Sequence, residues 1–359
     1  MMKILFIVRS TLFTARGGDT IQVQETATAL RNLGLQVYIK KSSEQINYAQ
    51  YDGLHFFNIT RPADILLHIK KSGKPFVVST ILINYALYDK HHRQGLAGKL
   101  LNKFSEPGIE YLKAIYRFAT GKDKLVSLSY LWKGQQASIR EILKKSNAVL
   151  VQAEAEYDDL VKLYGVSPDH YTVHNGINTC LFQNKRKTEK EKNLVLCVAR
   201  IEGIKNQYNL IRALNNTAYR LVLIGDAAPN QQDYYNECRK IAAKNISFVS
   251  HLPQQQLAEH YAAASVHVLP SWFEVCGLSS LEAAVMGCRV VITGNGYAGA
   301  YFNDDAFYCD PAEPQSILEA VENAMAAGDN GQLQQKILQQ FTWKKTAEDT
   351  LAVYKNIFN

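Results

Sequence analysis

The stretch that decides the fold reads Val266-His-Val-Leu-Pro-Ser-Trp-Phe-Glu-Val-Cys-Gly-Leu-Ser-Ser-Leu-Glu282. It opens with the apolar run Val266 to Leu269, which is typical of a buried strand. A polar loop with one glycine follows, and residues 281–286 then have the apolar pattern of a helix that Gly287 ends. A strand, a loop and a helix in this order predict a parallel sheet covered by helices.

The same alternation continues along the chain in both directions. In the first half, strands are expected at residues 3–8, 36–39, 53–57, 76–79 and 148–151, and helices at 21–33, 63–71 and 154–163. In the second half, strands are expected at 194–198, 219–224, 246–249, 266–269 and 289–292, with a helix near 210–214. We therefore expect an α/β protein with two Rossmann-like domains facing across a cleft, residues 1–180 and 181–342, joined by the charged tract 184–193.

Composition limits the class of protein. The chain has 359 residues, 47% of them hydrophobic and 20% charged, as in ordinary globular proteins. Its six cysteines all lie in the second half without the spacing of metal ligands or redox pairs, which indicates a reducing compartment and no disulfides. Neither a signal peptide nor an apolar run long enough to span a bilayer is found. We expect a cytoplasmic protein.

Residues 86–130 interrupt the alternation and are expected to be mostly helical. The net charge of the chain is +7, and many of its cations gather in and just after this segment: Lys90, Arg93, Lys99, Lys103, Lys113, Arg117, Lys122, Lys124 and Lys133. Two interpretations stay open. The tract is either a solvated helical face or a basic surface for an anionic acceptor or the inner membrane leaflet.

Residues 271–282 form the densest polar cluster in an apolar neighbourhood. A helix N-terminus offers backbone N–H groups and a positive dipole end, which suit phosphate, and Gly277 would let the backbone approach a ligand closely. Glu274 in the loop and Glu282 in the first helical turn can accept hydrogen bonds from sugar hydroxyls. Alternatively, Ser279 and Glu282 have the spacing of a capping box, so that Glu282 would merely close the helix end.

The segment Glu274-Val-Cys-Gly-Leu-Ser-Ser-Leu-Glu282 resembles the E-x7-E motif of the retaining GT-B glycosyltransferases of family GT4, the glycosyl transferases group 1, with Cys276 in place of the usual Phe. Other parts agree with the family pattern: Val198-Ala-Arg-Ile-Glu-Gly-Ile-Lys205, His174-Asn-Gly-Ile-Asn178, the pair Gly17-Gly18 and Phe341-Thr-Trp343. The resemblance covers nearly the whole chain and is weaker over residues 54–130. It implies the GT-B fold, with residues 343–359 as a helix that returns to the first domain.

The resemblance also implies the roles of particular residues. Arg200, Lys205 and Glu274 are the implied catalytic residues, the two cations holding the leaving diphosphate and Glu274 the transferred sugar. The implied donor-binding residues are Gly17, Gly18, Arg200, Lys205, His251, Leu252, Glu274, Cys276, Gly277, Leu278 and Glu282. Among these, Glu282 would bind the ribose, and the loop of His251 and Leu252 would contact the nucleobase through its backbone.

The pattern lacks the paired carboxylates of a metal-dependent transferase. Because no Asp-x-Asp occurs, we expect neither a metal nor another cofactor. Many members of the family carry a His after the strand at residues 76–79, where this chain reads Ser79-Thr-Ile-Leu-Ile-Asn-Tyr85. Replacements to consider are Asn84, Thr80, His91, His92 and His55, although a His inside an apolar strand is more typical of a core.

The expected function is transfer of a hexose, with retention, from a UDP-sugar such as UDP-glucose to a saccharide or lipid-linked saccharide in polysaccharide biosynthesis. One alternative is a non-catalytic nucleotide-sugar-binding subunit of a transferase complex. Another is a related epimerase, which would need further acid and base carboxylates. A nicotinamide dehydrogenase is disfavoured because no Gly-x-Gly-x-x-Gly follows the first strand, and no nucleic-acid partner is expected.

Overall fold

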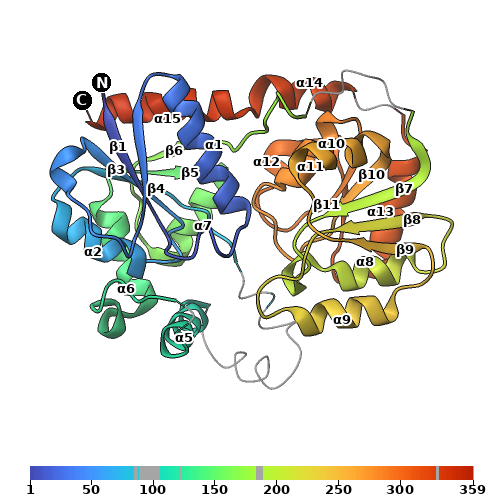
Figure 1. Ribbon diagram of the computed structural model, residues 1–359, viewed down its shortest axis with the longest axis horizontal. Helices are drawn as coiled ribbons and strands as arrows, with labels where there is room; N and C mark the ends of the chain where they lie inside the picture. The colour runs from blue at the N-terminus through green and yellow to red at the C-terminus, as the bar shows by residue number, and fades with distance from the viewer. Residues whose placement is uncertain (85–87, 89–105, 122, 183–188, 329–330, 359) are drawn as a thin grey trace. The chain divides into compact units, whose positions relative to one another are not determined.

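The computed structural model of the chain describes residues 1–84, 88, 106–121, 123–182, 189–328 and 331–358 (Figure 1). These residues form two compact units. Unit 1 contains residues 1–86, 94–175 and 343–359, and unit 2 contains residues 87–93 and 176–342. The chain thus passes from unit 1 to unit 2 between Asn175 and Gly176, five residues before the expected boundary.

Unit 1 is built on a six-stranded parallel sheet of order β2-β1-β3-β4-β5-β6. The strands are β1 (Lys3–Val8), β2 (Gln36–Lys41), β3 (Gly53–Phe57), β4 (Phe76–Ser79), β5 (Ala148–Val151) and β6 (His170–Thr172). The helices are α1 (Gly18–Asn32), α2 (Ala63–Ser72), α5 (Glu106–Ala119), α6 (Tyr130–Lys145), α7 (Glu154–Tyr164) and α15 (Trp343–Phe358), with a 3-10 turn at Tyr48–Gln50.

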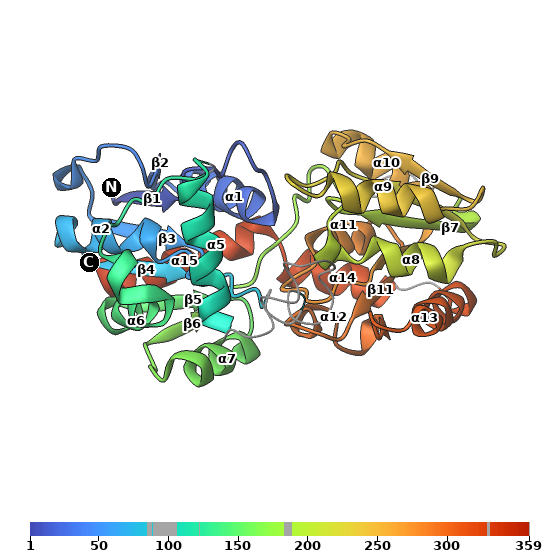
Figure 2. The same cartoon turned by 90° about the horizontal axis from the view of Figure 1, so that it is seen from below.

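Helices α1 and α15 cover one face of this sheet. Val23 and Ala27 of α1 and Val353 and Tyr354 of α15 are buried in one apolar core with Phe6 of β1. Helix α15 follows unit 2 in the chain yet packs along α1 (Figure 1). On the other side, α6 packs on α2 and α5 runs beside α6 (Figure 2).

Unit 2 repeats the architecture with a second six-stranded parallel sheet, of order β12-β11-β10-β7-β8-β9. Its strands are β7 (Glu191–Val198), β8 (Arg220–Ile224), β9 (Ile246–Val249), β10 (Ala264–Leu269), β11 (Arg289–Thr293) and β12 (Phe307–Cys309). Its helices are α8 (Gln207–Leu214), α9 (Gln232–Ile241), α10 (Gln254–Ala263), α11 (Leu278–Val285), α12 (Gly299–Phe302), α13 (Pro314–Ala326) and α14 (Gly331–Gln340), with 3-10 turns at Gly203–Lys205 and Asn303–Asp305.

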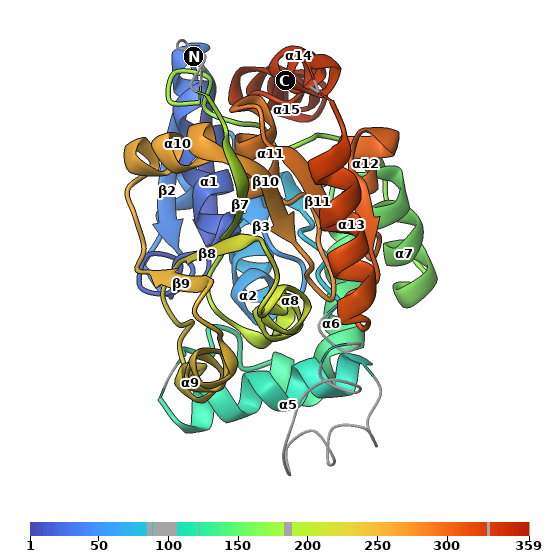
Figure 3. The ribbon, with the colours of Figure 1, turned by 90° about the vertical axis from the view of Figure 1, so that its right-hand side faces the viewer.

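Apolar side chains of the β7 strand alternate between the two faces of this sheet. Leu194 and Leu196 belong to the core under α10, α11 and α14, whereas Val195 and Cys197 belong to the core under α8, α9 and α13. Helices α8 and α13 lie side by side on the latter face (Figure 3). Because both faces are covered, the buried part of β7 is a continuous apolar run rather than an alternation with polar residues.

Two Rossmann-like units with parallel sheets confirm the predicted α/β class, and several element bounds differ from the predictions. Strand β7 begins at Glu191, inside the tract expected to be a linker, because Glu191 still pairs with Ala264 of β10. Of the segment 86–130 that was expected to be helical, residues 86–87, 89–105 and 122 lie outside the described residues. Among the others, the structure has α5, and residues 123–129 are not helical. Helix α6 was not predicted. No helix among the described residues is long and apolar enough to cross a membrane.

Candidate active site

The second sheet reverses its strand order between β7 and β10, which are neighbours in space. From β7 the chain continues to β8 on one side, and from β10 it continues to β11 on the other. The loops that leave the carboxyl ends of these two strands therefore diverge, and ligands of open α/β sheets bind in the crevice between such loops. The two loops touch here, since the backbone N–H of Trp272 donates to the carbonyl of Ile204 at 2.8 Å.

Glu274 makes the central contacts between the loops that follow β7 and β10. Its Oε2 lies 2.6 Å from Nζ of Lys205 and accepts a hydrogen bond from the Ser271 hydroxyl at 2.9 Å. Its Oε1 accepts from the backbone N–H of Gly277 at 3.2 Å. The side chains of Lys205 and Glu274 are 23% and 10% exposed, so the ion pair is sheltered yet still reachable from solvent. The structure thus brings together two residues that lie 69 positions apart in the sequence.

A third loop, which follows β11, holds the main chain of Glu274. The N–H of Glu274 donates to the carbonyl of Asn295 at 3.0 Å, and the N–H of Tyr297 donates to the carbonyl of Glu274 at 2.8 Å. Between them, Gly296 has a φ of 109°, and a Cβ there would lie 2.2 Å from the Glu274 carbonyl oxygen. Only glycine fits this close approach. Sequence reasoning missed this loop, although its Gly-Asn-Gly at the end of a predicted strand was a usable signal.

Gly277 forms the N-cap of α11 in the left-handed region, with φ 71° and ψ 55°. The helix therefore starts at Leu278, not at residue 281 as predicted. Cys276 is 4% exposed and packs in the core of unit 2, so any contact of this residue with a ligand would be through its main chain. Burial raises the pKa of the Cys276 thiol, which makes a reactive thiolate unfavourable there.

Glu282 lies in the second turn of α11 rather than in its first. The capping-box interpretation is wrong for this reason: the N-cap is Gly277, and Ser279 is already inside the helix. Instead, Oε2 of Glu282 accepts a hydrogen bond from the Tyr261 hydroxyl of α10 at 3.1 Å, and the residue is 8% exposed. Burial, and then the charge of Glu282, raise the pKa of Tyr261, so its hydroxyl remains a donor.

Arg200 and Lys205 both belong to the loop after β7, as predicted from the sequence. Arg200 is the more open of the two, with 38% of its side chain exposed, and its Nη2 pairs with Glu202 at 2.8 Å. Its main-chain carbonyl accepts from the side-chain amide of Gln207, which fixes the loop against α8. Lys205 ends the 3-10 turn Gly203–Lys205 that aims it at Glu274.

The remaining predicted donor-binding residues belong to other elements. His251 and Leu252 follow β9, and the N–H of exposed His251 donates to Asp226 at 3.1 Å. Gly17 and Gly18 belong to unit 1, where Gly17 is the N-cap of α1 with an extended φ of −159°. Since this φ is open to any residue, the backbone conformation alone does not require glycine at Gly17.

The candidates for the missing His have structural partners of their own. His55 is buried, with Nδ1 2.5 Å from the Tyr354 hydroxyl and Nε2 2.8 Å from that of Ser79, as expected for a core residue. Thr80 is 0% exposed and donates to the buried carboxyl of Glu156 at 2.5 Å. Asn84 is half-buried, and His91 and His92 lie outside the described residues. Neither His55 nor Thr80 presents its side chain to solvent.

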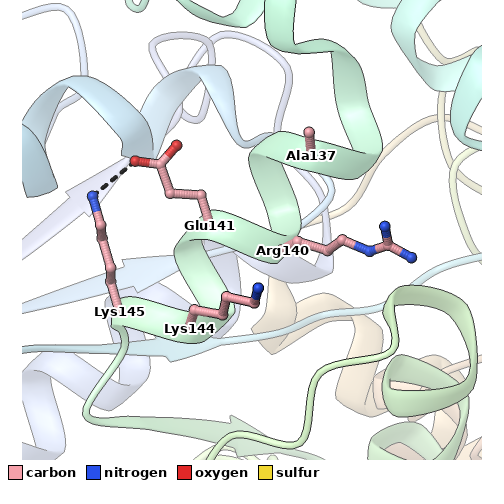
Figure 4. A pocket seen from close by; sticks show the side chains of 5 residues that line it. All are labelled: Ala137, Arg140, Glu141, Lys144 and Lys145. Atoms are coloured by element: carbon pink, nitrogen blue, oxygen red, sulfur yellow. Dashed lines mark hydrogen bonds and ion pairs between the residues drawn. The ribbon is translucent and has the colours of Figure 1, made fainter.

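A shallow hollow lies on the outside of α6, lined by Arg140, Lys144, Lys145, Glu141 and Ala137 (Figure 4). Glu141 pairs with Lys145 at 2.8 Å and also with Lys133. Arg140 points away from that pair and donates to the carbonyl of Tyr164 (Figure 4). The hollow consists of solvated side chains of one helix face, and we assign no ligand to it.

Comparison with known proteins supports the fold. Residues 181–340 match the family described as glycosyl transferases group 1. Sucrose-phosphate synthase from Thermosynechococcus elongatus superposes with a TM-score of 0.76 at 15% identity, covering 99% of this chain and 98% of that one. HepE of Anabaena, in complex with UDP and glucose, superposes with a TM-score of 0.71 at 15% identity, covering 99% and 100%. The chain therefore has the GT-B fold.

Curated relatives agree with this class. The D-inositol 3-phosphate glycosyltransferase of Acidothermus cellulolyticus is 24% identical over 244 residues, 60% of this chain and 54% of the relative. The alpha-maltose-1-phosphate synthase of Mycolicibacterium smegmatis is 24% identical over 253 residues, 61% of this chain and 65% of the relative. The chain thus spans between half and two thirds of the length of these relatives. The match to the family of glycosyl transferases group 1 is confined to residues 181–340, which lie in unit 2.

Proposed function

We propose that the chain is a retaining, metal-independent glycosyltransferase that moves a hexose from a UDP-sugar to a saccharide or lipid-linked saccharide acceptor in polysaccharide biosynthesis. The observation that carries the proposal is the Lys205–Glu274–Ser271 cluster at the switch point of the second sheet. Relatives support the class of reaction, and HepE supports the donor, because its structures contain UDP and UDP-glucose.

In this proposal, the donor lies between the loops that follow β7 and β10. Lys205 and Arg200 would hold the diphosphate, and Glu274 would accept hydrogen bonds from hydroxyls of the transferred hexose. The start of α11 at Gly277 and Leu278 would bind phosphate through backbone N–H groups. Glu282 would bind the ribose, and its bond with Tyr261 would keep the carboxylate in place.

The reaction would then need little covalent chemistry from the enzyme. The bond between the anomeric carbon and the phosphate oxygen breaks, and its electron pair goes to the diphosphate. The acceptor hydroxyl attacks from the same face, and its proton passes to the departing phosphate oxygen. Fixed cations that stabilise the developing charge are the main contribution of such a site, and Lys205 is already oriented by Glu274 before the donor arrives.

Exchange of these cations tests the proposal. We expect Arg200→Ala and Lys205→Ala each to lower UDP release from UDP-glucose by roughly 100-fold or more, because each removes stabilisation of the leaving group. Arg220→Ala is a matched control, since it removes the same charge from the amino end of β8. The candidate site lies at the carboxyl ends of the strands of the same sheet. Normal turnover in both site variants would exclude this mechanism. Donor binding without any turnover in the wild type would favour the non-catalytic subunit.

We also propose peripheral contact with an anionic membrane. Half of the ten large apolar side chains that are exposed in the described residues lie between positions 112 and 132: Leu112, Tyr116, Phe118, Leu128 and Trp132. Exposed Lys124 and Lys133 belong to the same segment. Exposed aromatic residues among cations are typical of surfaces that lie in the headgroup region.

Sedimentation with vesicles tests this contact. We expect the chain to bind vesicles that contain anionic lipid, and Trp132→Ala to weaken the binding about 10-fold, since Trp132 is 75% exposed. Tyr38→Ala is the control, because Tyr38 is an exposed aromatic residue on β2 of the same unit. Equal binding of vesicles with and without anionic lipid would contradict the proposal.

A further inference from the structure

Unit 1 has a switch point of its own, because β1 and β3 are neighbours in its sheet while β2 lies beyond β1. Beyond the carboxyl end of β3 lies a pocket between the start of α2, the last turns of α5 and residues 123–125. Five charged side chains line it: Arg61, Asp64, Arg117, Asp123 and Lys124. The formal charge of this set is +1. Every residue that lines the pocket belongs to unit 1.

Arg61 is neutralised by the two carboxylates. Its Nε lies 2.9 Å from Oδ2 of Asp64, and its Nη2 contacts Oδ2 of Asp123. Desolvation would lower the pKa of Arg61, but the charges of Asp64 and Asp123 outweigh it and raise that pKa. Arg61 thus keeps its proton, and the two carboxylates offset its positive charge.

The second oxygen of each carboxylate is occupied as well. Oδ1 of Asp64 accepts from the Ser42 hydroxyl at 2.5 Å. Oδ1 of Asp123 accepts from the Ser10 hydroxyl at 3.1 Å and from the backbone N–H of Lys124 at 2.9 Å. These bonds hold both carboxylates in place on Arg61 and leave them little capacity for another cation.

Arg117 is the second guanidinium that lines the pocket. Its Nε is buried and has no hydrogen-bond partner in the described part of the chain. Burial and the neighbouring charge of Arg61 lower the pKa of Arg117, against the opposing effects of Glu110 and Asp123. A buried donor on a charged group is costly when it stays unsatisfied, so an added acceptor would be strongly favoured.

The size of the pocket restricts that acceptor. The volume of the cavity is about 30 Å³, which suits one compact group rather than a sugar ring. The start of α2 at Ala63 also lines the pocket and adds the positive end of a helix dipole. The preferred ligand is therefore small, anionic and able to accept from a planar guanidinium.

We propose that this pocket binds a phosphate ester group, with Arg117 as the principal ligand. The group belongs to a soluble sugar phosphate or to a phosphate-bearing lipid, and the two sources share this chemistry. That the group is carried by the glycosyl acceptor rests on the proposed function, whereas phosphate binding itself does not.

Calorimetry with inorganic phosphate, at ionic strength matched with NaCl, tests the site. We expect Arg117→Met to weaken phosphate binding by about 10-fold or more, since it removes charge-assisted hydrogen bonds. Without phosphate, Arg117→Met should unfold at a temperature no lower than the wild type, because an unsatisfied buried donor is gone. Phosphate should also slow amide hydrogen exchange at residues 58–64 and 108–121 of the wild type, and not of the variant.

Controls separate this proposal from its alternatives. Lys144→Gln removes one exposed charge from α6 of the same unit and should leave phosphate binding unchanged. If Arg117→Met fails to fold, Arg117→Lys keeps the charge but not the fork, and should still bind phosphate several-fold more weakly. Equal phosphate affinity in the wild type and the Arg117 variant overturns the proposal, whatever the result for sugar transfer.

The two sources are distinguished by further titrations. Tighter binding of a hexose phosphate than of inorganic phosphate indicates a soluble ligand. Binding to vesicles with a lipid phosphomonoester that Arg117→Met weakens, with no gain from a hexose phosphate, indicates a lipid. Phosphate binding that persists in Lys205→Ala, while turnover is lost, would show that the pocket is independent of the donor site.

Discussion

Exchange of Gly296 for alanine tests whether the loop after β11 determines the position of Glu274. The new Cβ would lie 2.2 Å from the Glu274 carbonyl oxygen and 2.9 Å from its main-chain N and C atoms. Real contacts of this kind begin near 3.0 Å, so the main chain of Glu274 must move by about 0.8 Å. The φ of 109° adds strain that an L-residue cannot relieve without turning the loop.

The expected cost follows from these two terms. An alanine at positive φ costs about 1–2 kcal/mol, and the forced backbone shift costs about 1–3 kcal/mol more. At roughly 2–4 °C per kcal/mol for a domain of this size, the unfolding temperature of unit 2 should fall by about 4–20 °C. Because both main-chain bonds of Glu274 run to this loop, a displacement of this size should also lower turnover by roughly 100-fold.

The assay is thermal unfolding together with UDP release from UDP-glucose. Gly294→Ala is the matched control, because a Cβ there meets only a ring carbon of Tyr308 at 4.0 Å, at an unstrained φ. It should unfold and turn over like the wild type. The reasoning is refuted if Gly296→Ala matches Gly294→Ala in both measurements.

Two further predictions concern stability. Arg200→Ala should leave the free energy of unfolding within about 0.5 kcal/mol of the wild type, since the Arg200 side chain is 38% exposed. Lys205→Ala should lower the free energy of unfolding by about 1 kcal/mol, because the sheltered ion pair is lost. A denaturant titration in which Arg200→Ala is the less stable variant contradicts this prediction. Burial lowers the pKa of His267 to about 3, so its contribution to stability is full above its ordinary pKa of 6.5 and is lost as the pH falls from there towards 3. Between pH 7 and pH 5, His267→Phe should therefore lose about 2 kcal/mol less than the wild type, and an equal loss in both would exclude a neutral buried imidazole.

Much of the fold was predictable because apolar runs and their glycine stops carry local information. The β4, β5, β9 and β11 strands appear within a residue of the predicted ranges. Helix α9 was missed although Tyr234, Cys238 and Ile241 recur at helical spacing, because polar and charged residues make up most of the segment and Cys238 is its single fully buried residue. Strands β6 and β12 have three residues each, too few for a pattern.

The loops of the candidate site could be predicted from the sequence, but the contacts between their side chains could not. Lys205 and Glu274 each follow a predicted strand, but their pairing depends on the strand order, which places β7 beside β10. The hydrogen bond between Tyr261 and Glu282 joins α10 to α11, and the sequence pattern of neither helix indicates this bond. His55 was correctly interpreted as a core residue, because an apolar strand buries its side chains regardless of their polarity.

The position of α15 also affects the order of synthesis. Ala347, Val353 and Tyr354 belong to the core of unit 1, yet the ribosome makes them after all of unit 2. The nascent unit 1 therefore exposes the apolar face of α1 throughout the translation of residues 176–342. Unit 2, which is nearly continuous in sequence, can fold first, so that the earlier half of the gene product is the later to mature.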